Sequence, residues 1–106
     1  MIQAIKNLFG FGPKVDYSEL LKQGAIILDV RTKGEFEQGH IKGSVNISVN
    51  VLNANLNKLK NKDKPIITCC ASGSRSAMAK DILKSNKYSQ VFNGGSWLSL
   101  QKKIRN

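Results

Sequence analysis

The segment "PIITCCASGSRS", Pro65 to Ser76, passes from a continuous apolar run into a stretch of small and polar residues. The run Pro65–Cys69 is typical of a β-strand buried on both faces. After it, apolar side chains recur with helical spacing from about Arg75, and they predict the buried face of a helix: Met78, Ala79, Ile82 and Leu83. The segment therefore predicts a strand, a tight loop and a helix in succession.

Upstream of this segment, short apolar runs also alternate with helical patterns. Asp16 begins one such pattern, with Glu19 at the capping-box spacing and Gly24 as its stop. Three further elements are predicted before residue 50: a buried strand over Ala25–Val30, a short helical turn that starts near Lys33 and ends before Gly39, and a brief strand over Ser44–Ile47.

The remaining elements follow the same alternation. Leucines at i, i+4 and i+7 (Leu52, Leu56 and Leu59) predict a helix that ends near Asn61. A last strand is expected over Gln90–Asn93, then a turn at Gly94 and Gly95, then a closing helix lined by Trp97, Leu100 and Ile104. Regular alternation of strands and helices predicts an α/β fold with a mostly parallel central β-sheet flanked by helices on both faces.

The chain of 106 residues is long enough for one domain with a core and too short for two ordinary ones. We assign residues 1–12 to an N-terminal amphipathic arm and residues 13–106 to the domain. The arm, with Ile2, Ile5, Leu8 and Phe9 on one face, is expected to pack on the domain or fray rather than enter a membrane. It lacks the apolar core and cleavage site of a secretory signal, and no apolar run is long enough to span a membrane. A cytoplasmic protein is expected.

The formal net charge of +10 is high for this length. The lysines are dispersed and aromatic residues are few, so nucleic-acid binding is not favoured. The charge suits a small anionic substrate and leaves open an acidic protein partner.

Cys69 and Cys70 are the only cysteines. A disulfide between sequence neighbours would be strained, and two cysteines with the single histidine, His40, leave a structural zinc site one ligand short. No metal site is therefore expected. Side chains alternate along a strand, so one thiol should point into packing while Cys70, the last residue before the loop, stands at the centre of the loop.

The loop after Cys70 has the composition of an anion-binding site. Its residues are small, Gly73 can adopt a positive φ, and backbone N–H groups converge where a helix begins. Such surroundings lower the pKa of a thiol, and Arg75 adds a positive charge. Counted from Cys69, Arg75 closes the Cys-x5-Arg spacing of tyrosine phosphatases; counted from Cys70, it closes the tighter Cys-x4-Arg.

In the second register, "CASGSRS" resembles the active-site loop of the rhodanese-like domains. "LDVRTKGEFEQGHIKGSVNI" (Leu28 to Ile47) is similar to the leading motif of that family, and "VFNGGSW" (Val91 to Trp97) to its closing strand. The matched segments run in the family's order from about Asp16 to Leu100.

The resemblance implies a single-domain thiosulfate sulfurtransferase that needs no cofactor. Cys70 would take a sulfane sulfur from a donor such as thiosulfate, form a persulfide, and pass the sulfur to cyanide or a thiol. The implied substrate-binding residues are those of the loop: Ala71, Ser72, Gly73, Ser74, Arg75 and Ser76. For the hydroxyls of Ser74 and Ser76, helix capping is favoured over contact with the sulfur.

Four residues outside the loop are assigned to structural support. We expect Asp29 and Arg31 to form an ion pair or caps that brace the loop region together with Glu35, rather than to steer substrate. His40 resembles a turn-stabilising residue of the family and is not favoured as a general base.

Two other functions stay open. A phosphatase or arsenate reductase would use Cys69 as its nucleophile. A persulfide carrier or docking module would bind an acidic partner through the basic surface and turn over thiosulfate poorly.

Overall fold

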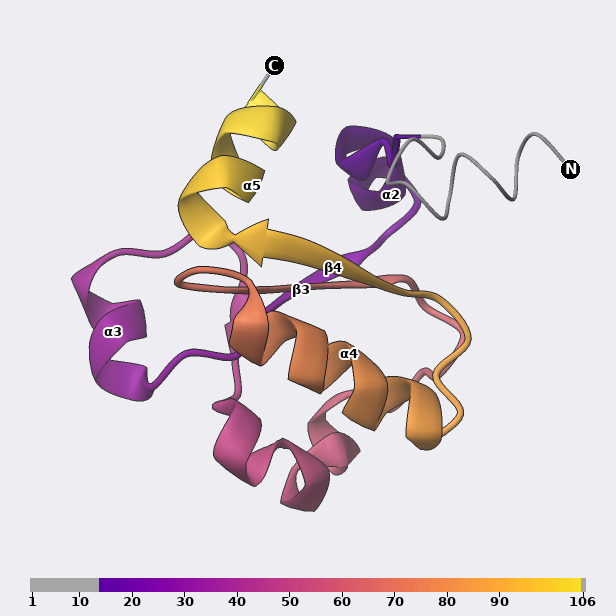
Figure 1. The fold of residues 1–106 in the computed structure, drawn as a ribbon. Coiled ribbons are helices and arrows are strands. Elements are labelled where there is room, and N and C mark those ends of the chain that lie inside the picture. Colours follow the sequence, from indigo (N-terminus) through magenta and orange to yellow (C-terminus); the bar gives the residue numbers. More distant parts are fainter. Residues whose placement is uncertain (1–13, 106) are drawn as a thin grey trace, which may run out of the picture.

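The computed structural model describes residues 14–105 (Figure 1). The proposed arm, residues 1–12, lies outside the described residues. The elements in chain order are α2 (Tyr17–Lys22), β1 (Ile26–Asp29), α3 (Lys33–Gln38), β2 (Val45–Asn46), the 3₁₀ helices η1 (Val49–Ala54) and η2 (Leu56–Lys58), β3 (Ile66–Cys70), α4 (Ser74–Ser85), β4 (Val91–Ser96) and α5 (Trp97–Arg105). Within residues 14–105, no helix combines the length and apolar character needed to cross a membrane.

The four strands form one parallel sheet in the order β2-β1-β3-β4. The predicted α/β fold with a parallel central sheet is thus confirmed. The two central strands carry the longest apolar runs, and β3 is buried at every position. All strands point the same way, so the carboxyl ends of β1 and β3 lie side by side, with Asp29 opposite Cys69.

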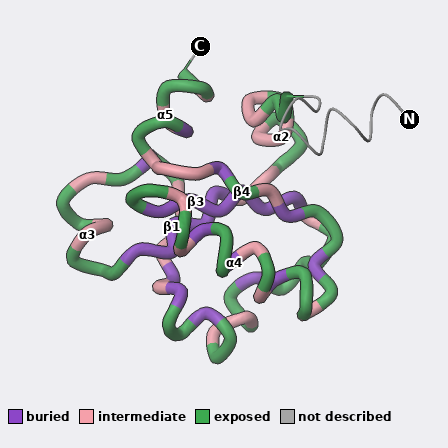
Figure 2. The backbone as a smooth tube through the Cα atoms, in the orientation of Figure 1, coloured by how far each residue is buried: buried purple, intermediate pink, exposed green. Residues whose placement is uncertain are grey.

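Helices cover both faces of the sheet, as predicted, and each face has its own core (Figures 1 and 2). On one face, Leu28, Ile66 and Cys70 pack with Ala79 and Leu83 of α4 and with residues of η1. On the other face lies a cluster formed with α2 and α5: Ile27, Ile41, Ile67, Cys69 and Leu100, with Tyr17, Leu20, Leu21, Ala25, Trp97 and Ile104 packed against it. Alternation along β3 sends its two cysteines into different cores.

The helix predicted around Leu52, Leu56 and Leu59 is wrong in type. The segment forms two short 3₁₀ helices, separated at Asn55, whose side chain donates a hydrogen bond to the carbonyl of Val51. Asparagine side chains that bond to nearby backbone groups compete with a regular α-helix. The leucine spacing still identified buried positions, because Leu52 and Leu59 lie in the core.

Two smaller expectations are also wrong. Met78 is 56% exposed rather than buried on α4. Gly94 and Gly95 lie inside β4 instead of forming a turn, and the register shifts by one residue there, since Thr68 pairs with Asn93 but Cys70 with Ser96. This bulge carries the strand past the loop that follows Cys70.

Close packing requires a glycine at position 94. A Cβ atom there would lie 2.8 Å from the carbonyl oxygen of Thr68, 2.9 Å from Cγ2 of Ile67 and 3.0 Å from Cδ2 of Leu100. We expect Gly94→Ala to lower the free energy of unfolding by about 1–3 kcal/mol, because the buried neighbours must move. Denaturant unfolding measures this effect.

Gly34→Ala is the matched control. Gly34 lies in α3, and a Cβ there would meet nothing within 4 Å. This substitution should be neutral or stabilise by about 0.5–1 kcal/mol. Equal destabilisation by both variants would contradict the packing explanation.

Candidate active site

The loop between β3 and α4 lies at the carboxyl end of the sheet. Cys70 is the last residue of β3, and α4 begins four residues later at Ser74. Gly73 is the N-cap of α4 and has φ 109°, a left-handed conformation that side chains other than glycine's rarely allow. The reversal of the chain at Gly73 turns the backbone N–H groups at the start of the helix toward the cysteine.

The sulfur of Cys70 accepts two backbone hydrogen bonds. The N–H of Gly73 lies 3.0 Å from Sγ and that of Ser76 lies 3.3 Å from it. Oγ of Ser76 lies 3.6 Å from the same sulfur. Burial raises the pKa of the Cys70 thiol, but hydrogen bonds from the Ser76 side chain and from the N–H groups of Ser76, Gly73 and Ser72 outweigh it and lower the pKa below its ordinary value. This loop therefore stabilises a thiolate.

Cys69 has the opposite environment. It packs in the core on the other face of the sheet and is completely buried. Burial, followed by the neighbouring carboxylate of Asp29, raises the pKa of Cys69 to about 12. At neutral pH, Cys69 is a protonated core residue, which does not suit the nucleophile of the phosphatase alternative.

Ser76 links the cysteine to β4 through Asn93, a residue that the sequence analysis did not single out. The Ser76 hydroxyl lies 2.6 Å from Oδ1 of Asn93 and 2.9 Å from the carbonyl oxygen of Gly73, so its single hydrogen can be donated to either of these acceptors or to the sulfur of Cys70. Oδ1 of Asn93 also accepts a hydrogen bond from the N–H of Gly95 at 2.9 Å. In the sequence, Asn93 stands out only as a polar residue directly before two glycines. That pattern does not indicate that its side chain contacts Ser76 of α4.

The capping role favoured for Ser74 and Ser76 is wrong. The N-cap of α4 is Gly73, and no side chain caps the helix there. Ser76 is buried beside the sulfur, while Ser74, Ala71 and Ser72 are exposed at the outside of the loop. The loop thus divides into an inner wall and a solvent-facing rim.

Arg75 pairs with Glu35 rather than pointing freely into solvent. Its Nη1 and Nη2 atoms lie 2.7 Å and 3.0 Å from the two carboxylate oxygens of Glu35. Thr32 and Glu35 form a complete capping box at the start of α3. The bond from Arg75 and those from Thr32 lower the pKa of Glu35 to about 2. The carboxylate therefore stays charged throughout the neutral range.

Asp29 and Arg31 form a buried ion pair at the end of β1. Nη2 of Arg31 lies 2.7 Å from Oδ2 of Asp29, and the guanidinium also donates to the carbonyls of Glu35 and Gly39. The guanidinium carbon lies 4.7 Å from the centre of the Trp97 ring. Arg31 thereby holds both ends of the segment of residues 35–39 against the end of β1.

His40 lies at the end of the same segment. Its Nδ1 atom is 2.7 Å from the carbonyl oxygen of Phe36, and its ring stacks on the Phe36 ring with centroids 3.7 Å apart. The structure thus places His40 within the turn after α3.

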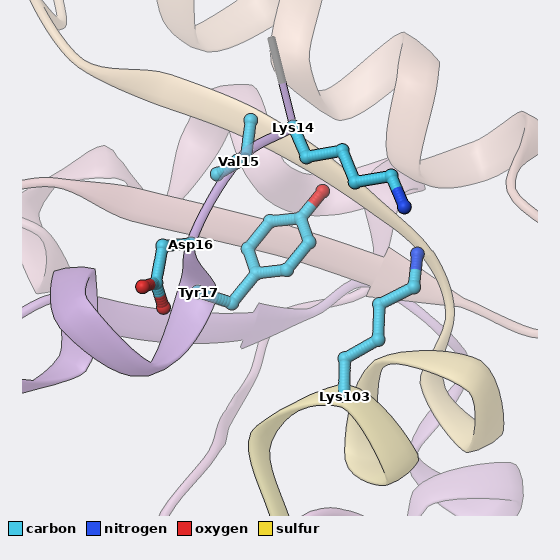
Figure 3. Close-up of a pocket in the computed structure, with 5 residues that line it drawn as sticks. All are labelled: Lys14, Val15, Asp16, Tyr17 and Lys103. Carbon is cyan, nitrogen blue, oxygen red and sulfur yellow. The ribbon is translucent and has the colours of Figure 1, made fainter. Parts of the chain in front are cut away.

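A separate hollow of about 800 Å³ lies between the start of α2 and α5 (Figure 3). It is lined by Lys14, Val15, Asp16, Tyr17 and Lys103. None of these residues belongs to the loop of residues 70–76, so the loop and the hollow are different features of the surface.

The fold and the loop can be compared with known proteins. The rhodanese-like domain family matches residues 14–100. The putative sulfur carrier protein YrkF of Bacillus subtilis is 38% identical over 87 residues, which cover 82% of this chain and 44% of that protein. The thiosulfate sulfurtransferase GlpE of Pseudomonas fluorescens is 32% identical over 74 residues, covering 70% of this chain and 67% of that one.

A solved structure shows the same likeness. The human single-domain sulfurtransferase TSTD1 superposes with a TM-score of 0.71 at 25% identity, covering 87% of this chain and 97% of that chain. The chain belongs to the rhodanese-like domain family, which confirms the resemblance seen in its motifs. It spans about half the length of several curated relatives, including 51% of YibN of Escherichia coli and 54% of YqhL of Bacillus subtilis.

The hydrogen bonds around Cys70 generate a prediction for pH dependence. We expect Ser76→Ala to raise the pKa of Cys70, because the variant loses the hydroxyl beside the sulfur and burial still disfavours the thiolate. The pH profile of iodoacetamide alkylation, with Cys70 followed by peptide mapping, measures this pKa. The profile should move to higher pH, so alkylation at neutral pH should slow.

Ser74→Ala is the control, because Ser74 is exposed at the rim of the loop. Its alkylation profile should coincide with that of the unmodified protein. Superimposable profiles for all three proteins would show that the Ser76 hydroxyl does not stabilise the thiolate.

Proposed function

We propose that the protein is a sulfurtransferase that carries a sulfane sulfur as a persulfide on Cys70. The observation that carries the proposal is the sulfur of Cys70, which accepts N–H bonds from Gly73 and Ser76 inside a tight loop at a helix N-terminus. The named relatives support it, since they include a thiosulfate sulfurtransferase and a putative sulfur carrier.

The first half-reaction follows from the state of the thiol. The Cys70 thiolate attacks the outer sulfur of a donor such as thiosulfate, the S–S bond of the donor breaks, and sulfite leaves with the bonding electron pair. No general base is needed, because the loop already lowers the pKa of the thiol. The N–H groups that face Sγ also stabilise negative charge on the persulfide.

In the second half-reaction, a thiophilic acceptor such as cyanide or a thiolate attacks the outer sulfur of the persulfide. The bond between that sulfur and Sγ breaks, and Cys70 returns as a thiolate. The side chain of Cys70 is fully buried under the loop, so donor and acceptor gain access only when the loop moves outward. The small exposed residues Ala71 and Ser72 and the left-handed Gly73 suit such a movement.

The size of the loop favours sulfur over phosphate. Four residues separate Cys70 from Arg75, and the N–H of Gly73 already lies 3.0 Å from Sγ. A persulfide adds one atom beyond Sγ, whereas a phosphoenzyme intermediate would have to fit a tetrahedral group with several oxygens.

We further propose that the protein works in the cytoplasm, where a catalytic thiol stays reduced, and that its basic surface suits an acidic protein partner.

The division of roles between the cysteines provides the test. Cys70→Ser should reduce sulfur transfer from thiosulfate to cyanide by on the order of 10³-fold or more, because the nucleophile is lost. Cys69→Ser should keep most of the activity and mainly lower stability, since Cys69 is a core residue. Intact-mass measurement after incubation with thiosulfate, followed by peptide mapping, should locate one added sulfur atom on Cys70.

Three outcomes would argue otherwise. Equal inactivation of two folded variants would refute separate roles for the cysteines. Hydrolysis of aryl phosphates that requires Cys69, with no added sulfur, would indicate a phosphatase. A persulfide that forms on Cys70 but turns over slowly, and is discharged by one specific protein, would indicate a carrier.

A further inference from the structure

Arg75 is the only charged side chain between Cys70 and Ser76, and its charge is already compensated. Both terminal nitrogens of its guanidinium bind the Glu35 carboxylate, at 2.7 Å and 3.0 Å. The two side chains are 31% and 38% exposed, so the pair lies at the surface beside the loop. The Glu35 carboxylate thus binds the face of the Arg75 guanidinium that an incoming anion would otherwise bind.

The carboxylate is held in this position from several directions. Its Oε1 atom accepts hydrogen bonds from N–H and Oγ1 of Thr32, at 3.0 Å and 3.1 Å. The backbone of Glu35 is fixed as well: its N–H donates to Oγ1 of Thr32, and its carbonyl accepts from Nη1 of Arg31. An anionic ligand would have to compete with a carboxylate that is already ordered.

The pairing changes the field that a donor meets. A free guanidinium beside the loop would attract a dianion more strongly than a monoanion, since Coulomb energy scales with charge. A guanidinium paired with a carboxylate presents only a dipole. Apart from the general field of a chain with net charge +10, the attraction at the loop comes from the N–H groups at the start of α4. These groups bind a sulfur through direct hydrogen bonds and do not require a doubly charged donor.

We propose that Glu35 is a specificity-determining residue: by neutralising Arg75, it makes the site favour sulfur donors that bear at most one negative charge over dianionic donors such as thiosulfate. This inference rests on the proposed sulfur transfer through Cys70. The donor class it names is a sulfane sulfur carried on a thiol or on another singly charged group. Transfer from such a donor balances in the same way as from thiosulfate: the S–S bond to the outer sulfur breaks, and a thiolate or sulfinate leaves with the electron pair.

The test compares two donors in the unmodified protein and in Glu35→Gln. Thiosulfate carries two negative charges, and methanethiosulfonate carries one because a methyl group replaces an oxyanion. Glutamine retains the capping-box geometry at this position, so α3 should form normally. The rate of sulfur loading on Cys70, followed by intact mass, should rise about tenfold with thiosulfate. It should rise only about threefold with methanethiosulfonate, because half the charge gives half the Coulomb energy.

Glu37→Gln is the matched control. It removes the same charge from an exposed position of the same helix. Both donors should load this variant at rates close to those of the unmodified protein. An equal thiosulfate gain in both variants would reduce the effect to net charge and overturn the role of Glu35. An equal loss with both donors in Glu35→Gln would overturn it too, by showing that the pair only holds the loop in shape.

A second measurement does not depend on sulfur transfer. Iodoacetate is an anion and iodoacetamide is neutral, so the ratio of their alkylation rates at Cys70 reports the local charge. Glu35→Gln should raise the iodoacetate to iodoacetamide ratio severalfold, and Glu37→Gln should leave it unchanged. An unchanged ratio in Glu35→Gln would overturn the inference. A raised ratio without sulfur loading from either donor would instead overturn the proposed sulfur transfer and leave the charge effect of Glu35 standing.

Discussion

The guanidinium of Arg31, buried at the carboxyl end of β1, joins parts of the chain on which the site depends. It binds the carboxylate of Asp29 and the carbonyls of Glu35 and Gly39, and it lies against the Trp97 ring. Removing one partner from a buried ion pair typically costs about 3–5 kcal/mol, because the other charge is left without compensation. Through Arg31, the turn that carries Glu35 is therefore anchored to the end of β1.

A second ion pair connects this turn to the start of α4. Glu35, fixed by Thr32 and by the Arg31 contact to its carbonyl, binds Arg75 at the start of α4. The two pairs differ in kind, since Asp29 and Arg31 are buried whereas Glu35 and Arg75 are partly exposed. We regard the buried pair of Asp29 and Arg31 as structural, and the partly exposed pair of Glu35 and Arg75 as the one that interacts electrostatically with a substrate.

The two cysteines show how strongly position within one strand decides chemistry. They are sequence neighbours in β3, yet alternation places them in different cores. The pKa of Cys69 is raised to about 12 by burial and by Asp29, while hydrogen bonds from Ser76 and the loop lower that of Cys70. Both side chains are fully buried, so access to solvent does not distinguish them. What distinguishes Cys70 is its hydrogen-bond donors, the N–H groups of Gly73 and Ser76.

Much of this protein follows from its sequence alone. The alternation of apolar runs and helical patterns predicted a parallel sheet covered on both faces, because burial requires those periods. The spacing of Cys70, Gly73 and Arg75, and the motifs on either side of the loop, indicate the family. Strand alternation by itself predicts that Cys69 and Cys70 point to opposite faces of the sheet.

Tertiary structure decided the partners. Glu35 and Arg75 are forty positions apart, and Ser76 and Asn93 are seventeen apart, so no local pattern shows that they meet. The Asn55 side chain competes for the Val51 carbonyl where the leucine-spaced segment divides into two 3₁₀ helices. Close packing against Thr68 and Leu100 surrounds Gly94 within β4. A sequence pattern shows which side chains are apolar and therefore buried. Contacts between side chains distant in the chain depend instead on the assembled sheet, because the strand order determines which strand ends are neighbours.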